Sequence, residues 1–265
     1  MPESPEVQAL VDFLGEHAVG RRIADVDVLE FRTVKTRARP PSGLVGEEIT
    51  GASRFGKHVD LAVGDAHFGI ALGRHGWARW TEPGAEPVPG DDAPPSLATI
   101  ALDDGARLDL TDAGAWVSLG LTVTDDPRDV PAVAKLGADP ADPGFSRADL
   151  DAVIVGRRKQ LKAVLQEQES LAGIGNAYSD EILHAAKLSP VVRAADLSAD
   201  ERERLFTATT SILRDAIAAR RGIPLDQLKA AKVASMRVHG RAGEACPVCG
   251  GTVREFAFGS TTAEY

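Results

Sequence analysis

The first residues with a capacity for chemistry are Pro2 and Glu3, in the opening stretch MPESPEV. A proline nitrogen inside a chain is an amide, whereas a terminal proline is a secondary amine whose pKa lies near neutrality, as for other α-amino groups. Removal of the initiator methionine, usual before a small second residue, would expose that amine beside the Glu3 carboxylate. The pair predicts a nucleophile next to a group that can transfer protons.

A second candidate site lies in SLAGIGNAYSDEI, where Gly173 and Gly175 flank Ile174. Such a turn lets two helices meet closely, and the second helix then presents free backbone N–H groups to an anion. Asn176 would add a side-chain donor there. Gly-x-Gly turns are common between ordinary helices, so this turn indicates phosphate binding only together with other motifs.

Cys246 and Cys249 are the two cysteines of the chain, and they have C-x-x-C spacing. In a chain without a secretion signal, this spacing favours a metal pair or free thiols over a disulfide framework. Two thiolates would fill half of a tetrahedral zinc site.

The sequence also predicts the helices and strands that position these residues. Residues 4–20 predict a helix, with Ser4 as its cap, Pro5 in its first turn and Gly20 at its end. Strand-like segments then extend to about residue 130, including a hairpin over 98–110, and the Pro-rich and acidic stretch 81–96 predicts a surface loop. Further helices are expected over 145–154, 158–190 and 198–222, followed by a β-hairpin that carries the cysteines.

The composition limits the classes of protein to which the chain can belong. A chain of 265 residues with 43% hydrophobic content permits more than one domain. We expect a cytoplasmic protein, because no apolar run reaches the roughly 18 residues of a membrane span. The net charge of −9 argues globally against a nucleic-acid partner. Three basic clusters weaken that argument: Arg32, Lys35, Arg37 and Arg39; Arg157, Arg158, Lys159 and Lys162; and the stretch from Lys229 to Arg241.

Together these motifs resemble the formamidopyrimidine-DNA glycosylase and endonuclease VIII family of base-excision repair enzymes. The resemblance covers nearly the whole chain, through MPESPEV, SRFGKHVDL, KLGADP, LQEQESLAGIGNAYSDEIL and VHGRAGEACPVCG. It implies an α+β fold in three parts. These are an N-terminal β-sandwich catalytic domain over 1–130, a helix-two-turn-helix DNA-binding domain over 131–228, and a zinc-finger-like hairpin over 229–265.

The resemblance also implies an activity, that of a bifunctional DNA glycosylase and abasic-site lyase. Such an enzyme would act as a monomer on damaged double-stranded DNA in the nucleoid. In this family the terminal proline amine, here Pro2, attacks C1′ of the damaged nucleotide and forms a cationic Schiff base that promotes elimination of the phosphates. Glu3 would shuttle a proton to the sugar ring oxygen.

Other family roles map onto single positions of this chain. Lys57 would hold the phosphate beside the lesion and support catalysis, Asn176 would grip the same backbone, and Lys162 would be a further DNA contact. Arg74 and His75 align with the wedge that fills the space left by a flipped base. The metal ligands would be Cys246 and Cys249, which would bind a structural zinc ion.

The chain departs from the family pattern at three places. TDAGAW at residues 111–116 replaces the Asp-Pro-Arg-Arg-Phe-Gly loop of members that remove oxidised purines. This pattern is closer to the endonuclease VIII branch, so the identity of the excised base stays open. A second cysteine pair would fall about 15–20 residues after the first, near Tyr265, so we expect either a truncated finger, which we favour, or a finger without zinc. The phosphate-binding arginine of the hairpin falls at Thr261, where hydroxyl groups would have to substitute.

Two other classes remain open. The acidic charge and the missing arginines suit a non-catalytic protein that binds damaged DNA with the same fold, although such a protein has no need of Pro2, Glu3 and Lys57 together. An N-terminal-proline tautomerase would share Pro2 as a base. That class explains neither the helix-two-turn-helix motif nor the cysteine pair.

Overall fold

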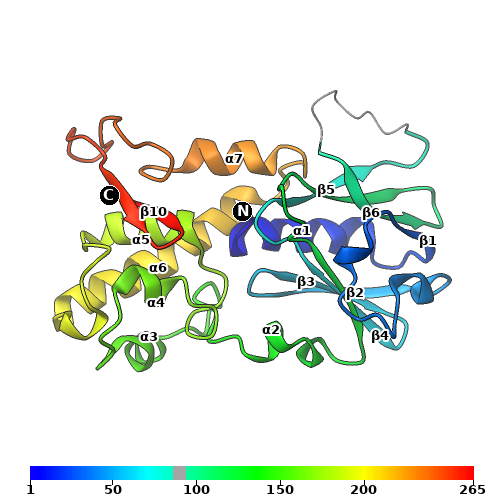
Figure 1. Ribbon diagram of the computed structural model, residues 1–265, viewed down its shortest axis with the longest axis horizontal. Coiled ribbons are helices and arrows are strands. Elements are labelled where there is room, and N and C mark those ends of the chain that lie inside the picture. The colour runs from blue at the N-terminus through cyan, green and yellow to red at the C-terminus, as the bar shows by residue number, and fades with distance from the viewer. Residues whose placement is uncertain (86–93) are drawn as a thin grey trace. The chain divides into compact units, whose positions relative to one another are not determined.

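The computed structural model describes residues 1–85 and 94–265, so the predicted surface loop over 81–96 lies partly outside the described residues (Figure 1). Contacts between Cα atoms divide the chain into two compact units. Unit 1 contains residues 1–2, 6–134 and 221–229, and unit 2 contains residues 3–5, 135–220 and 230–265. The expected domain limits at 130 and 228 remain a prediction.

Unit 1 is built on two four-stranded sheets whose neighbouring strands are all antiparallel. The strand orders are β1-β6-β7-β5 and β2-β3-β4-β8 (Figure 1). The strands are β1 Ile23–Val28, β2 Ile49–Phe55, β3 His58–Val63, β4 Ala66–Ala71, β5 Gly76–Thr81, β6 Ser96–Leu102, β7 Arg107–Asp112 and β8 Gly120–Thr124. Alternate residues of these strands fill a single core, as the period of a half-buried strand requires.

Helix α1, Ser4–His17, adds an apolar stripe of Val7, Leu10 and Leu14 to that core. It differs from the prediction at both ends. The helix stops at His17, before Gly20, and the Ser4 hydroxyl is buried without a hydrogen-bond partner among the described residues, so Ser4 is not the cap that its type suggests.

Short helices complete unit 1. These are η1 Phe31–Thr33, η2 Pro41–Leu44, η3 Pro127–Asp129 and α2 Pro131–Ala134. In η3, the Asp126 side chain accepts from the Arg128 backbone and forms a capping box with Asp129.

Unit 2 is mainly helical. It contains α3 Arg147–Ile154, α4 Leu161–Leu165, α5 Asn176–Ala186, η4 Ala194–Asp196, α6 Ala199–Arg220 and most of α7 Leu228–Ser235. Ser146 and Asp149 form the predicted capping box of α3, and Ser198 with Glu201 makes the same reciprocal bonds before α6. Helix α7 was not predicted, because its lysines suggested only a charge cluster.

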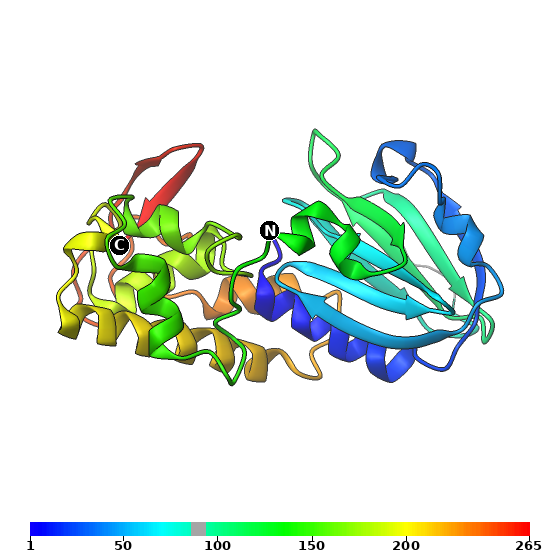
Figure 2. The same ribbon diagram turned by 90° about the horizontal axis from the view of Figure 1, so that it is seen from below.

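The chain ends in a hairpin of β9 Glu255–Phe258 and β10 Thr261–Glu264, which projects from the helices of unit 2 (red in Figure 2). The predicted α+β class is therefore confirmed, with an N-terminal β-sandwich, a helical middle and a C-terminal hairpin. None of the described helices is both long and apolar enough to cross a membrane.

Candidate active site

The Glu3 carboxylate lies at the N-terminus of α5 and is 1% exposed. Its Oε1 accepts a hydrogen bond from the Ala177 backbone at 3.0 Å, and its Oε2 accepts from Gly175 and from Tyr178. The first N–H groups of a helix have no partner inside the helix, and the helix dipole favours a negative charge there. Glu3 is thus held as an anion in a site made by the backbone.

The two glycines of the turn make this approach possible. A Cβ on Gly175 would lie 2.6 Å from the Glu3 carboxyl carbon, so the carboxylate occupies the space that a side chain would need. Gly173 has φ +91°, a conformation that favours glycine, and its carbonyl accepts from the Ser4 backbone at 3.0 Å. The N–H groups that the sequence assigned to a DNA phosphate therefore bind a carboxylate of the same chain.

Lys232 on α7 is the cationic partner of this carboxylate. Its Nζ lies 3.3 Å from Glu3 Oε1, and its side chain is 9% exposed. The same ammonium lies 4.9 Å from the centre of the Tyr178 ring, within the range of a cation–π interaction. Sequence reasoning missed this residue, because a lysine in a basic stretch gives no sign of burial.

Pro2 is buried and lies one peptide bond from Glu3. Met1 is attached in this structure, so the Pro2 nitrogen is an amide here. Lys57 occupies the two-residue turn between β2 and β3, after Gly56 at φ +56°, and is half-buried. By contacts, both Pro2 and Lys57 belong to unit 1.

Asn176 is the first residue of α5 and is half-buried. Its side-chain oxygen accepts from Gln166 Nε2 at 2.9 Å, as the amide groups are assigned. This bond orients the side chain and leaves the amide nitrogen of Asn176 as the donor group. The arrangement is compatible with the predicted contact to a DNA backbone.

Lys162 does not lie where a DNA contact requires it to be. Its side chain is 0% exposed, and its ammonium forms an ion pair with Asp180. Burial lowers the pKa of Lys162, and the Asp180 charge opposes that shift. Asp180 also binds His239 Nδ1 at 2.8 Å, and His239 lies 3.1 Å from Glu264 of β10. Lys162 is therefore the buried cation of a cluster that joins α4, α5 and the hairpin.

Arg74 and His75 lie in the turn between β4 and β5, and both are exposed. The Arg74 backbone donates to Ser118 Oγ at 3.0 Å, and the His75 carbonyl accepts from the Ala113 backbone at 3.3 Å. The predicted wedge turn is thus bonded to the loop over residues 113–119.

Asp112 organises that second loop. Its carboxylate accepts from the Gly114, Ser118 and Leu119 backbones at 2.8–3.1 Å and from the Ser118 hydroxyl at 2.8 Å. Burial alone would raise the pKa of the Asp112 carboxyl, but these hydrogen bonds outweigh it and hold the pKa below its usual range. The loop presents Trp116, whose side chain is 83% exposed. The sequence TDAGAW suggested the loss of a wedge, and the exposure of this indole was not predicted.

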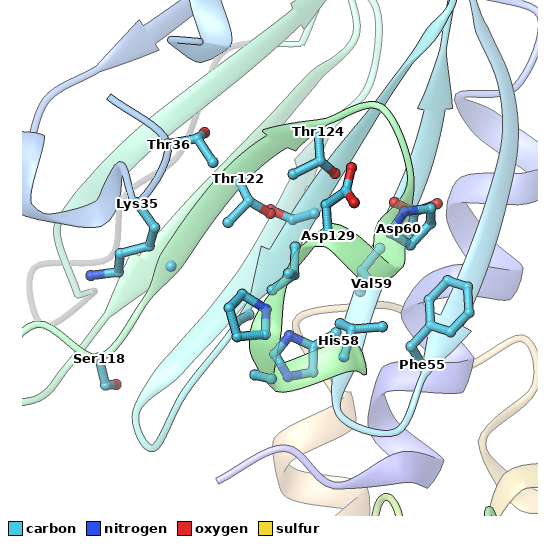
Figure 3. Close-up of a pocket in the computed structure, with 18 residues that line it drawn as sticks. Lys35, Thr36, Phe55, His58, Val59, Asp60, Ser118, Thr122, Thr124 and Asp129 are labelled. Atoms are coloured by element: carbon cyan, nitrogen blue, oxygen red, sulfur yellow. The ribbon is translucent and has the colours of Figure 1, made fainter. Parts of the chain in front are cut away.

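A separate pocket of about 420 Å³ lies on the outer face of the β2-β3-β4-β8 sheet (Figure 3). His58 and Asp60 of β3 line it, with Gly69, Gly120 and Thr122 among the small residues of its floor. Burial raises the pKa of Asp60 against the opposing effect of His67, and burial followed by the Lys57 charge lowers the pKa of His58. None of the site residues predicted from the sequence lines this pocket.

The cysteine pair lies in a tight loop before β9. The Val248 backbone donates to Cys246 Sγ at 3.5 Å, and His184 Nε2 lies 3.2 Å from the same sulfur. Backbone hydrogen bonds from Val248 and Cys249, followed by the contact with His184, lower the pKa of Cys246 to about 6. A thiol that ionises this readily is suited to bind a metal.

Comparison with known proteins decides the family. Residues 1–115 match the model for the formamidopyrimidine-DNA glycosylase N-terminal domain, and residues 136–226 match the model for its H2TH domain. The formamidopyrimidine-DNA glycosylase of Mycolicibacterium gilvum is 33% identical over 281 residues, which cover 100% of this chain and 96% of the relative. The chain belongs to the formamidopyrimidine-DNA glycosylase family.

Solved structures agree with this assignment. The MutM (Fpg) protein of Thermus thermophilus matches with a TM-score of 0.82 and 25% identity, over 100% of this chain and 97% of that one. Fpg (MutM) of Lactococcus lactis, solved with DNA containing N7-benzyl-Fapy-dG, matches with a TM-score of 0.85 at 23% identity, over the same shares, and supports the fold. This glycosylase is accordingly an enzyme of base-excision repair.

Proposed function

We propose that this glycosylase removes oxidised bases from double-stranded DNA and cleaves the resulting abasic site, with Pro2 as nucleophile and Glu3 as proton shuttle. The observation that carries the proposal is the buried Glu3 carboxylate, held by the α5 backbone one residue from Pro2. Removal of Met1 turns the Pro2 nitrogen into the secondary amine that the reaction needs.

The chemistry balances with these two groups. The Pro2 nitrogen forms a bond to C1′ while the bond from C1′ to the base breaks, and the base leaves with that electron pair. Glu3 accepts the proton from the proline nitrogen and passes it to O4′, so that the C1′–O4′ bond opens and an iminium forms. The cationic iminium then withdraws electrons, which promotes elimination of the phosphate on each side of the sugar.

Binding roles are proposed for five further residues. Lys57 and Asn176 hold the backbone phosphates beside the lesion. Arg74 and His75 fill the space left by the flipped base, and their turn is bonded to the loop that presents Trp116. An exposed indole on a loop held by hydrogen bonds is suited to stack on bases. We propose that Trp116 shares the wedge role.

We also propose that Cys246 and Cys249 bind a structural zinc ion. Their spacing, the Val248 N–H bond to Cys246 and the lowered pKa of that thiol support this role. Zinc would hold the loop before β9 together and would take no part in the reaction.

Borohydride trapping tests the proposed function. The chain with Met1 removed, verified by mass spectrometry, is mixed with a duplex that contains an abasic site and then reduced. We expect a covalent complex that maps to Pro2. The complex should be diminished in Pro2→Gly, which keeps only a primary terminal amine, and lost from residue 2 in a matched chain that retains Met1, whose residue-2 nitrogen is an amide.

Absence of the adduct from the processed chain, with binding to the abasic duplex intact, would overturn the proposal. That result would favour the non-catalytic damaged-DNA-binding protein.

A further inference from the structure

Lys232 is buried, charged and in contact with the reacting carboxylate, yet the proposed function assigns it no role. Its ammonium contacts Glu3 Oε1 at 3.3 Å and faces the Tyr178 ring at 4.9 Å. Burial of a lysine loses hydration free energy, so such a residue is retained where its charge has a partner and an effect.

We propose that Lys232 is a positioning residue that keeps Glu3 ionised and ready to accept a proton. This inference rests on the proposed function, and it concerns the proton transfer that opens the sugar ring.

Burial of the Glu3 carboxylate costs free energy. A carboxylate that is 1% exposed loses most of its hydration, and burial by itself favours the neutral acid. Hydrogen bonds from the α5 backbone favour the anion, but the N–H groups that donate them carry no net charge. Lys232 supplies the full positive charge in contact with this carboxylate, and an opposite charge within 4–6 Å favours the ionised form.

The same contact assists both halves of the proton shuttle. An ionised Glu3 can accept the proton that the proline nitrogen loses when it attacks C1′. Once protonated, Glu3 stands beside an ammonium group and three backbone N–H groups, all of which favour its anion. It therefore transfers the proton onward to O4′ instead of retaining it.

The structure fixes Lys232 for this role. Arg220 also lies within cation–π range of the Tyr178 ring, at 5.8 Å from its centre. Arg220 donates to Ser235 Oγ at 3.0 Å, which attaches the last residue of α7 to the end of α6. Lys162 is a further buried cation whose charge interacts with Glu3, and it is paired with Asp180.

The experiment compares Lys232→Met with wild type in three assays at saturating enzyme. These are base excision from a duplex that contains dihydrouracil or thymine glycol, strand cleavage at a preformed abasic site, and affinity for an abasic-analogue duplex. Lys187→Met is the matched control, because Lys187 is an exposed lysine at the far end of α5, away from the helix start that binds Glu3.

We expect base excision by Lys232→Met to slow by about tenfold or more, while abasic cleavage and affinity change by about twofold or less, since the hemiacetal of a preformed abasic site opens to its aldehyde without the enzyme. Lys232→Arg, which keeps the charge, should recover most of the rate. Methylammonium added to Lys232→Ala should also restore part of it. A purely structural role would predict no rescue by methylammonium.

Two outcomes would overturn the inference. One is base excision by Lys232→Met at the wild-type rate. The other is an equal loss in all three assays at an unchanged melting temperature. If Lys232→Met fails to fold, Lys232→Arg and Lys232→Gln provide the same comparison of charge. If the wild-type enzyme neither excises the damaged base nor forms an adduct that borohydride traps, the proposed function itself is refuted. The two failures are therefore distinguishable.

Discussion

The Glu3 carboxylate combines burial with several polar contacts. It is buried, it accepts several hydrogen bonds from the start of α5, and it contacts a lysine. A buried carboxylate is tolerated when its oxygens have partners of this kind. The same partners stabilise its anionic form, which is the form that can accept the proton lost by Pro2.

Substitution of Glu3 by glutamine separates the two activities. Glutamine keeps the shape but cannot carry a proton from the proline nitrogen to O4′, so we expect base excision to fall by about 10²-fold to 10⁴-fold. Cleavage of a preformed abasic site should fall much less. Single-turnover assays on the two substrates provide the measurement, and an equal loss of both activities would remove the shuttle role from Glu3.

Single residues could be predicted to different degrees. The sequence MPESPEV indicated Pro2 and Glu3, because a terminal amine beside a carboxylate has a chemistry of its own. Lys162 was predicted as a DNA contact from its basic stretch, which does not reveal that this side chain is fully buried against Asp180. Lys232 was missed for the same reason. Burial depends on tertiary contacts, which residue type does not encode.

Elements were predicted where local signals decide their ends. The capping boxes of α3 and α6 are local, and both formed as predicted. The start of α1 depends on a residue far along the chain, because the Ser4 backbone N–H donates to the Gly173 carbonyl. The Ser4 hydroxyl does not cap the helix. The Gly-x-Gly turn was recognised as an anion site, but the identity of the anion depends on a residue far away in the chain.

The loop that Asp112 organises should contribute measurably to DNA binding. Loss of base stacking costs about 1–3 kcal/mol per base, so Trp116→Ala should weaken binding to a lesion duplex by roughly tenfold or more. Trp116→Phe should retain most of the affinity. Fluorescence anisotropy of labelled DNA is the assay.

Phe31→Ala is the matched control for that experiment, because Phe31 is a comparably exposed aromatic residue at 80%. Quenching of tryptophan fluorescence by DNA should also disappear in Trp116→Ala, since Trp77 and Trp80 are partly buried. Unchanged affinity and unchanged quenching would exclude Trp116 from the interface.

At the scale of the whole molecule, the net charge of −9 has to be reconciled with a polyanionic substrate. Many cations of the basic clusters are already paired with carboxylates. Arg32 pairs with Glu30, Arg39 pairs with Asp125, and both Arg157 and Lys159 pair with Glu167. These carboxylates compete with phosphates for part of the positive charge of the clusters.

Binding to DNA should consequently depend on salt, but only moderately. Each neutralised phosphate contributes about −0.9 to the slope of log affinity against log salt, so two to four contacts give a slope of about −2 to −4. Titrations between low and moderate salt measure it. An affinity that does not change over this range would exclude the basic clusters as the binding surface, and a slope near −8 would contradict the pairing described above.

The hydrogen bond between Glu3 and Gly175 has a consequence for the order in which the chain is synthesised, trimmed and folded. Its two ends are 172 residues apart, so Glu3 leaves the ribosome long before α5 exists to receive it. During that interval the N-terminus is an unstructured peptide, and an aminopeptidase can reach the Met1–Pro2 bond. Afterwards Pro2 is buried. Removal of Met1 during that interval therefore precedes assembly of the site around Glu3, and a chain that keeps Met1 presents that site with an amide in place of the amine.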